Sequence, residues 1–267
     1  MTWHVSTLLA LPALLGGALS WRLWRTLRSP RSSEEATASY YDNAALHRRY
    51  DHPVPVAYAT PKVAWAFAML RELEVDVARA SLLDVGGGNG YFSHVLQEGC
   101  PNTHVIDVSA PQLALNPLPP PRKHLGTAYH LPFADASFDV VWSSNLLHHL
   151  AHPERAVAEM ARVARHAVVV LEPSAHNLPL WIAAHLVPHE RQARKFTQSH
   201  VEKLLHSAPL TVQRHCFTGG MVLPNRTRAA ALPYVFASSH RRALCMTQIF
   251  VCTKQPPKSP GQVNRHD

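Results

Sequence analysis

The chain has 267 residues, enough for one sizeable α/β domain with additional segments. Its net charge of +8 is concentrated towards the ends, since four arginines and no acid stand in residues 1–31 and residues 254–267 add further cations. This distribution excludes a strongly basic, nucleic-acid-binding face on the central domain, and the four cysteines lack metal-ligand or Cys-x-x-Cys spacing.

Residues 5–21 form an almost uninterrupted apolar run, flanked by Trp3 and Trp21 and followed by three arginines. A cleaved signal peptide carries its positive charges before the apolar run. Here they follow it, which favours an uncleaved membrane anchor over residues 1–28, with the remainder facing the cytoplasm. Because the segment has arginine, serine and threonine but no acid, a mitochondrial targeting sequence is the alternative. A disordered or docked amino terminus stays open.

Residues 29–39 are polar and predict a linker to a domain spanning residues 40–254, and the proline-rich residues 255–267 predict a disordered tail. Residues 40–50 predict a short helix. Within residues 61–73, apolar side chains recur at helical spacing, which predicts the first long helix of the domain.

Residues 82–92 read as strand, tight turn and helix. An apolar run ends around Asp84, and Gly86, Gly88 and Gly90 follow with a Gly-x-Gly-x-Gly spacing. Such glycines let a ligand approach the backbone and deliver it to the free N–H groups of a helix start. In the dinucleotide pattern the third glycine would fall at Tyr91, so a different nucleotide-type cofactor is favoured.

Residues 103–107 predict a second strand that ends at Asp107, about 20 residues beyond the glycine motif, where a ribose-binding acid is expected. The next connection, residues 111–121, holds so many prolines that its helix should be shortened or replaced by an extended loop.

Residues 130–143 read His-Leu-Pro-Phe-Ala-Asp-Ala-Ser-Phe-Asp-Val-Val-Trp-Ser. The Leu-Pro-Phe segment predicts a rigid apolar elbow, because proline fixes its own φ and restricts the preceding residue. Residues 138–142 then predict a buried strand, rich in β-branched and aromatic side chains.

Together, the Asp-Val-Gly-Gly-Gly-Asn-Gly motif at residues 84–90 and the Leu-Pro-Phe-Ala-Asp-Ala-Ser-Phe-Asp-Val motif at residues 131–140 resemble the class I S-adenosylmethionine-dependent methyltransferases, in particular the small-molecule quinone and sterol group. The resemblance implies an α/β, doubly wound, Rossmann-like sheet of seven strands in the order 3-2-1-4-5-7-6, with strand 7 antiparallel. It implies S-adenosyl-L-methionine as cofactor. The implied cofactor-binding residues are Asp84, Gly86, Gly87, Gly88, Asn89, Gly90, Asp107, Val108, Thr127, Ala128, Tyr129, Ser143 and Ser144.

One position departs from the family pattern. Thr127 stands where many relatives have an aspartate that binds the adenine amino group. A hydroxyl accepts a hydrogen bond without the charge of a carboxylate, so weaker cofactor binding is expected.

In the carboxyl-terminal half, residues 153–165 predict a helix, residues 166–171 the fifth strand, and residues 210–217 and 243–254 the last two strands. Thr197 is a predicted helix cap for residues 197–207. The long connection at residues 174–196 predicts a lid or substrate-shaping helix, with an ordinary surface helix as the alternative.

Methyl transfer from a sulfonium needs mainly positioning, and a base only where the acceptor begins protonated. His148 and His149, just beyond the fourth strand, are the candidate bases, although packing beside the cofactor is the more common role at such positions. No zinc-binding pattern is present among the 19 histidines. We expect O- or C-methylation of a small, lipophilic acceptor. The alternatives are a catalytically silent methyltransferase-like binding or assembly factor at a membrane, and an NAD-dependent oxidoreductase.

Overall fold

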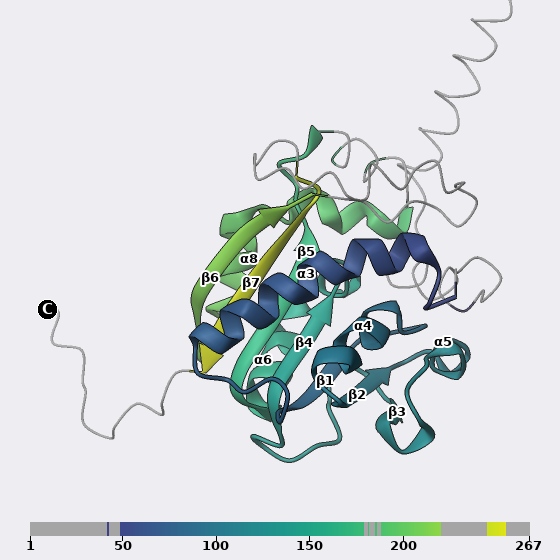
Figure 1. The fold of residues 1–267 in the computed structure, drawn as a ribbon. Helices are drawn as coiled ribbons and strands as arrows, with labels where there is room; N and C mark the ends of the chain where they lie inside the picture. The colour runs from purple at the N-terminus through teal and green to yellow at the C-terminus, as the bar shows by residue number, and fades with distance from the viewer. Residues whose placement is uncertain are drawn as a thin grey trace, which may run out of the picture.

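The computed structural model describes residues 42, 49–178, 181, 185, 188–219 and 245–254. Its centre is a seven-stranded sheet in the order β3-β2-β1-β4-β5-β7-β6 (Figure 1). Neighbouring strands are parallel except for β7, which runs antiparallel to both β5 and β6. The predicted fold class, strand order and antiparallel seventh strand are confirmed. The strands are β1 Ser81–Val85, β2 Asn102–Asp107, β3 Lys123–Leu125, β4 Phe138–Ser144, β5 Ala164–Pro173, β6 Leu210–Thr218 and β7 Thr247–Lys254.

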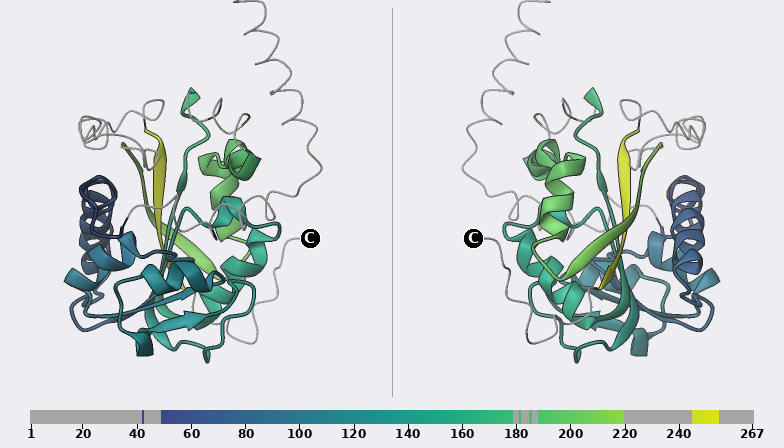
Figure 2. Two further views of the ribbon diagram at one scale, coloured as in Figure 1. Left: turned by 90° about the vertical axis from the view of Figure 1, so that its right-hand side faces the viewer. Right: turned by 90° about the vertical axis from the view of Figure 1, so that its left-hand side faces the viewer.

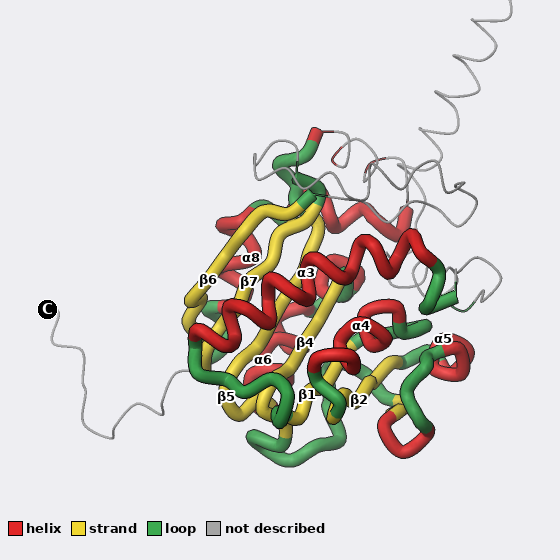
Figure 3. The backbone as a smooth tube through the Cα atoms, in the orientation of Figure 1, coloured by secondary structure: helices red, strands yellow, loops and turns green. Residues whose placement is uncertain are grey.

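Helices cover both faces of this sheet (Figures 2 and 3). One face carries α3 and α4, and the other carries α6 and α8. The helices and helical turns with continuous bounds are α3 Pro53–Glu72, α4 Tyr91–Gly99, α5 Ala110–Leu115, η2 Pro120–Arg122, η3 Leu147–His149, α6 Pro153–Val163, η4 Pro188–Lys195 and α8 Gln198–Leu205.

Two apolar layers hold these elements together, because side chains alternate between the two faces of a strand. In β1, Leu82 packs into the layer under α3 and α4, while Leu83 packs into the layer under α6 and α8. Trp142 of β4 is fully buried in the first layer. A sheet covered on both faces explains why its central strands read as continuous apolar runs.

The first long helix begins earlier than predicted. The sequence predicts its start at Pro61, whereas α3 begins at Pro53 and continues through Pro61. The His52 ring accepts a hydrogen bond from the Val54 N–H, and Pro53 occupies the first turn, where its missing N–H costs nothing. Burial of Val54 and Tyr58 against the sheet supports these two additional turns, residues 53–60.

Other boundaries follow the predictions more closely. The proline-rich connection shortens α5 to six residues, as expected. Thr197 caps α8 by accepting a hydrogen bond from the His200 N–H. The helix predicted to reach Arg165 ends at Val163, and β5 begins at Ala164, two residues before the predicted strand.

Several predictions lie outside the described residues. They concern the membrane anchor at residues 1–28, the linker at residues 29–39, nearly all of residues 40–50, and the tail at residues 255–267. Within the part of the chain that the structure describes, none of the helices combines the length and apolar character that crossing a bilayer requires.

Candidate active site

The glycine loop joins the carboxyl end of β1 to the start of α4, at the centre of the sheet. Gly88 has φ +50°, and a Cβ added there would make only one ordinary van der Waals contact, with Asp107 Oδ2 3.8 Å away. Gly87 is closed instead: a Cβ there would lie 2.6 Å from both Asp84 Oδ2 and Val105 Cγ2. The loop therefore packs closely against the sheet at Gly87, whereas at Gly88 its backbone is accessible on the side of Asp107.

Asp84 supports the loop from its buried side. Its side chain is fully buried, and Oδ2 accepts a 2.7 Å hydrogen bond from Ser93 Oγ of α4. Asn116 Nδ2 donates to both Ser93 Oγ and the Gly88 carbonyl, which extends the network around the loop. Burial raises the pKa of Asp84 to about 7, although the Ser93 hydrogen bond acts to lower it. Asp84 therefore shapes the loop from beneath, and its Oδ1 has no hydrogen-bond partner among the described residues.

Asp107 faces the loop from the carboxyl end of β2. Its Oδ2 accepts a 2.9 Å hydrogen bond from the Gly88 N–H, and its Oδ1 accepts a 2.8 Å bond from the Ser109 N–H. Burial raises the pKa of Asp107, while these backbone hydrogen bonds oppose the shift. Each carboxylate oxygen keeps a second acceptor site. Val108, next in the chain, is 75% exposed.

The segment that follows β3 forms one wall of the candidate site. The Gly126 N–H donates to the Asp107 carbonyl, which joins the predicted adenine-binding residues to β2. The exposed Thr127 accepts a hydrogen bond from the Tyr129 N–H through its own hydroxyl, so part of its capacity is used within its turn. The Tyr129 hydroxyl accepts from the backbone N–H groups of Ala151 and His152, which connects this wall to the segment after β4.

The segment that follows β4 forms another wall of the candidate site, and it begins at Ser143 and Ser144, where β4 ends beside β1. Ser143 is fully buried, and its hydroxyl has no hydrogen-bond partner in the described part of the chain. Asn145 adopts φ +52°, a conformation that costs free energy in a non-glycine residue, and its side-chain amide donates to the Tyr91 hydroxyl at 3.5 Å. Leu146 lies against the loop, because a Cβ added at Gly86 would be 2.8 Å from its Cδ1.

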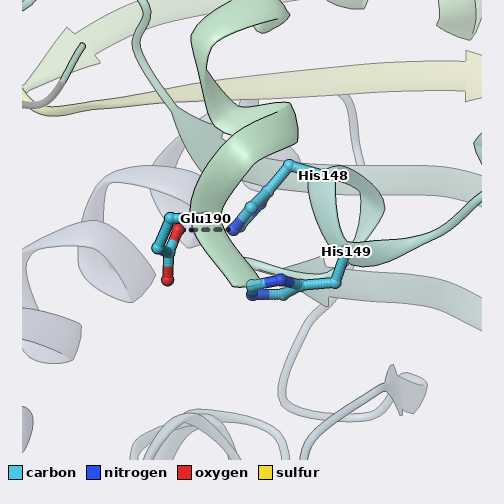
Figure 4. Close-up of side chains that lie close together, drawn as sticks. All are labelled: His148, His149 and Glu190. Carbon is cyan, nitrogen blue, oxygen red and sulfur yellow. Dashed lines mark ion pairs between the residues drawn. The ribbon is translucent and has the colours of Figure 1, made fainter. Parts of the chain in front are cut away.

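The two candidate bases, His148 and His149, lie in η3 directly after this wall and are both buried. His148 Nδ1 is 2.6 Å from Glu172 Oε2 at the end of β5, and His148 Nε2 is 3.2 Å from Glu190 Oε2 of η4 (Figure 4). Burial acts to lower the pKa of His148, but the charges and hydrogen bonds of Glu172 and Glu190 outweigh it and raise the pKa to about 10. With carboxylates at both ring nitrogens, His148 is poorly placed to act as the base that takes a proton from the molecule to be methylated.

Glu172 organises this region, although sequence reasoning did not single it out. Its Oε1 accepts hydrogen bonds from the Leu146 and Leu147 N–H groups, at 3.1 and 2.7 Å, and its Oε2 faces His148. The sequence feature that could have indicated Glu172 is its position as an acid directly after the apolar run of the fifth strand. Glu190 stands in a charged stretch and carries no such signal, because it meets His148 only through the tertiary fold.

The structure thus gathers the sequence-derived residues around one region at the carboxyl ends of β1, β2 and β4. Asp84, the glycines and Asp107 share a hydrogen-bond network, and the segments at residues 127–129 and 143–144 flank it. Ligands of open α/β sheets bind at this edge, where the strand order reverses between β1 and β4. His148 and His149 follow Leu146 in the chain, and His148 contacts Glu172 of β5 and Glu190 of η4.

Comparisons with known proteins agree with this arrangement. Residues 83–171 match the model of a family described as a methyltransferase domain. The chain is 31% identical over 147 residues to an uncharacterized methyltransferase of Mycobacterium marinum, covering 51% of this chain and 56% of that protein. It is 34% identical over 119 residues to a malonyl-[acyl-carrier protein] O-methyltransferase of Dechloromonas aromatica, covering 44% and 39%. The chain spans about half the length of the curated relatives it matches.

Solved structures share the fold. Magnesium protoporphyrin IX methyltransferase of Synechocystis, crystallised with bound S-adenosylmethionine, superposes with a TM-score of 0.56 at 13% identity, covering 85% of this chain and 100% of that one. A possible histamine N-methyltransferase of Thermotoga maritima gives 0.54 at 15% identity, covering 75% and 92%. At these identities the likeness concerns the fold.

Proposed function

We propose that this chain, which carries a methyltransferase domain at residues 83–171 in a class I fold, is an S-adenosylmethionine-dependent methyltransferase. The family match and the strand order bear out the resemblance, the fold and the cofactor predicted from the sequence. The observation that carries the proposal is the pairing of Gly88 with Asp107, an open glycine backbone facing a strand-end carboxylate at the reversal point of the sheet.

The residues present fit this cofactor. Asp107 has an acceptor site left on each carboxylate oxygen, which suits the two hydroxyls of a ribose. Ser143 offers a buried hydroxyl with no other described partner, and the first turn of α4 supplies backbone N–H groups beside the loop. Thr127 takes the adenine position with one hydroxyl instead of a carboxylate, which supports weaker binding than in relatives with an aspartate.

Bound S-adenosylmethionine supplies an electrophilic methyl group. The protein's part is to hold donor and acceptor in line and to keep water away. Glu172 fixes the backbone of Leu146 and Leu147, and Leu146 in turn covers Gly86. This chain of contacts gives the segment after β4 a defined position against the cofactor loop, which is what positioning catalysis needs.

We further propose a small, lipophilic acceptor that receives the methyl group on oxygen or carbon. Leu178 and Trp181, which follow β5, are 64% and 42% exposed and offer apolar side chains for such an acceptor after the carboxyl end of this strand. The apolar residues 5–21 support membrane association of the enzyme with the domain facing the cytoplasm, and a mitochondrial address remains the alternative. The relative from Dechloromonas aromatica, named for an acyl-carrier substrate, is consistent with an acyl or other lipophilic acceptor.

The test is isothermal titration calorimetry of the full chain with S-adenosylmethionine. In Asp107→Asn, one amide hydrogen would face a backbone N–H, and an acceptor for the ribose would be lost. We expect affinity to fall about 10- to 100-fold, corresponding to about 1.5–3 kcal/mol for a charged hydrogen-bonding group. The matched control is Asp139→Asn. Asp139 also accepts a backbone N–H, from Ser81, but lies at the amino end of β4.

Binding that is absent at millimolar cofactor, or equally reduced in both variants, would contradict the proposal. Tight binding without methyl transfer to a panel of quinones, sterols and acyl thioesters would favour the catalytically silent binding factor, which the Thr127 position supports. Selective retention of NADH would revive the oxidoreductase alternative.

A further inference from the structure

We propose that His148, His149 and Glu190 form a binding site for one divalent transition-metal ion of the zinc type, with Glu172 orienting His148. One ligand atom from each of the three residues lies within 4.8 Å of the others (Figure 4). The three residues come from η3 and η4, and Glu190 follows His149 by 41 positions in the sequence, so no linear metal-binding pattern indicates the site.

The separations fit tetrahedral coordination. Ligand atoms at about 2.0–2.2 Å from a tetrahedral Zn²⁺ are about 3.3–3.6 Å from one another. His148 Nε2 and Glu190 Oε2 are 3.2 Å apart, so one edge of the tetrahedron is already present. The remaining separations are at most 4.8 Å, so metal binding would draw these ligand atoms closer together.

Glu172 supplies the outer partner that metal-binding histidines characteristically have. Its Oε2 is 2.6 Å from His148 Nδ1, which places a proton on Nδ1 and directs Nε2 towards Glu190, where a metal ion would replace the Nε2 proton. Because Oε1 of Glu172 is held by two backbone N–H groups, the carboxylate cannot turn away. This carboxylate–histidine arrangement fixes both the tautomer and the direction of the first ligand.

The charges around His148 also favour a bound cation. Two carboxylates flank one imidazole, and a second imidazole lies with its ring centroid 3.9 Å from the first. A divalent ion would offset both carboxylate charges while leaving both rings neutral, which removes any repulsion between them. Glu190 is 29% exposed and the histidines are nearly closed off, so the site has a route to solvent on one side.

Two nitrogens and one carboxylate favour zinc, cobalt or nickel over calcium and magnesium, which take oxygen ligands. Three protein ligands leave a fourth position open for water or another molecule. If the proposed methyltransferase function holds, that position can bind the acceptor heteroatom beside the loop that Leu146 covers and lower its pKa as a Lewis acid. Metal binding itself does not depend on that function.

The test uses the tag-free full chain, stripped with a chelator and titrated with Zn²⁺ by calorimetry, and with Co²⁺ by absorption in the visible range. We expect one tight site, with affinity reduced about tenfold or more in His149→Gln and Glu190→Gln, and a comparable loss in Glu172→Gln through His148. The matched control is His152→Gln, which removes an exposed histidine whose Nδ1 is 3.4 Å from Glu154 Oε1.

Thermal unfolding separates this proposal from a simple ion pair. Zn²⁺ should raise the melting temperature of the wild type and of His152→Gln, and have a much smaller effect on His149→Gln. No tight Zn²⁺ binding by the wild type, or the same Zn²⁺ affinity in His149→Gln and Glu190→Gln as in the wild type, would overturn it. Titrating the same variants with S-adenosylmethionine measures cofactor binding independently of metal binding, so failure of the proposed function can be told apart from failure of the metal site.

Discussion

Lys62 is a buried cation outside the proposed site. Its Nζ donates hydrogen bonds to the carbonyls of Tyr58 and Gly219 at 3.2 and 2.8 Å, and it lies 3.8 Å from the centroid of the Tyr58 ring. Burial lowers the pKa of Lys62 to about 7, and the neighbouring thiols Cys216 and Cys245 act weakly in the opposite direction. The lysine joins α3 to the end of β6, at the expense of desolvating its charge.

This lysine predicts a pH-dependent stability. Between about pH 7, the pKa in the folded chain, and 10.5, its ordinary value, the unfolded chain binds more protons at this position, so stability rises with pH. The pKa of His148, raised to about 10, acts in the opposite direction in the wild type and in Lys62→Met alike, so the lysine is read from the difference between the two proteins. Chemical denaturation from pH 6.5 to 8.5 should show that the free energy of unfolding of the wild type, relative to that of Lys62→Met, rises with pH. Parallel profiles for the two proteins would contradict the assignment.

At the same residue scale, the cofactor side of the site was largely predictable and the histidine side was not. Asp84 and Asp107 belong to local motifs in which strand, glycines and acid follow one another, so sequence order alone places them. The environment of Asp84 was not accessible in this way, because Ser93 of α4 donates to it and Asn116, directly after α5, donates to Ser93. Glu172 and Glu190 meet His148 only once three separate segments have packed.

At the scale of an element, α3 shows how tertiary burial overrides a local signal. Pro61 lies inside this helix, cannot donate to the carbonyl of Ala57, and is exposed. The Thr60 hydroxyl donates to the Val56 carbonyl at 2.8 Å one residue earlier. The sequence predicts a boundary at Pro61 because proline ends most helices, whereas the buried face formed by Val54, Tyr58 and Val63 holds the helix continuous.

Replacing this proline should therefore stabilise the protein. In Pro61→Ala, the restored N–H can bond to Ala57 on a solvent-exposed face. We expect a gain of about 1–2 kcal/mol in the free energy of unfolding, less than the full helix-interior penalty of about 3 kcal/mol, because proline also restricts the unfolded chain. Urea denaturation measures the gain.

The control for this change is Pro53→Ala, at the first turn of the same helix, where no intrahelical hydrogen bond is missing. It should be near neutral or slightly destabilising. Equal gains from both substitutions would show that α3 does not run through Pro61 as a continuous helix in solution.

At the scale of the whole molecule, the pattern of alternating strands and helices predicts the sheet, because parallel strands joined by helices admit few topologies. The strand order itself came from family resemblance, since periodicity does not specify which strand inserts between which. The two apolar layers account for the agreement: each central strand contributes to both layers, so a shift in register by one residue would move side chains packed in one layer into the other and disrupt both.

Binding of the cofactor should stabilise the whole chain, because the loop, Asp107 and the segment after β4 come together only in the folded state. At 100 times its dissociation constant, S-adenosylmethionine should add about 2.7 kcal/mol to the free energy of unfolding. Differential scanning calorimetry should show a rise in melting temperature that grows with ligand concentration in the wild type. A similar rise in Asp107→Asn would show that the ligand binds elsewhere.

The position of β7 has a consequence for how the protein is made. This last strand, Thr247–Lys254, pairs with β5 on one side and β6 on the other, so β6 has no sheet neighbour until β7 arrives. During synthesis, β1 to β5 can assemble while β6 waits as an unpaired edge, and the sheet closes only after residue 254 has left the ribosome. The chain is therefore most exposed to aggregation and to chaperones late in translation, just before its final strand is delivered.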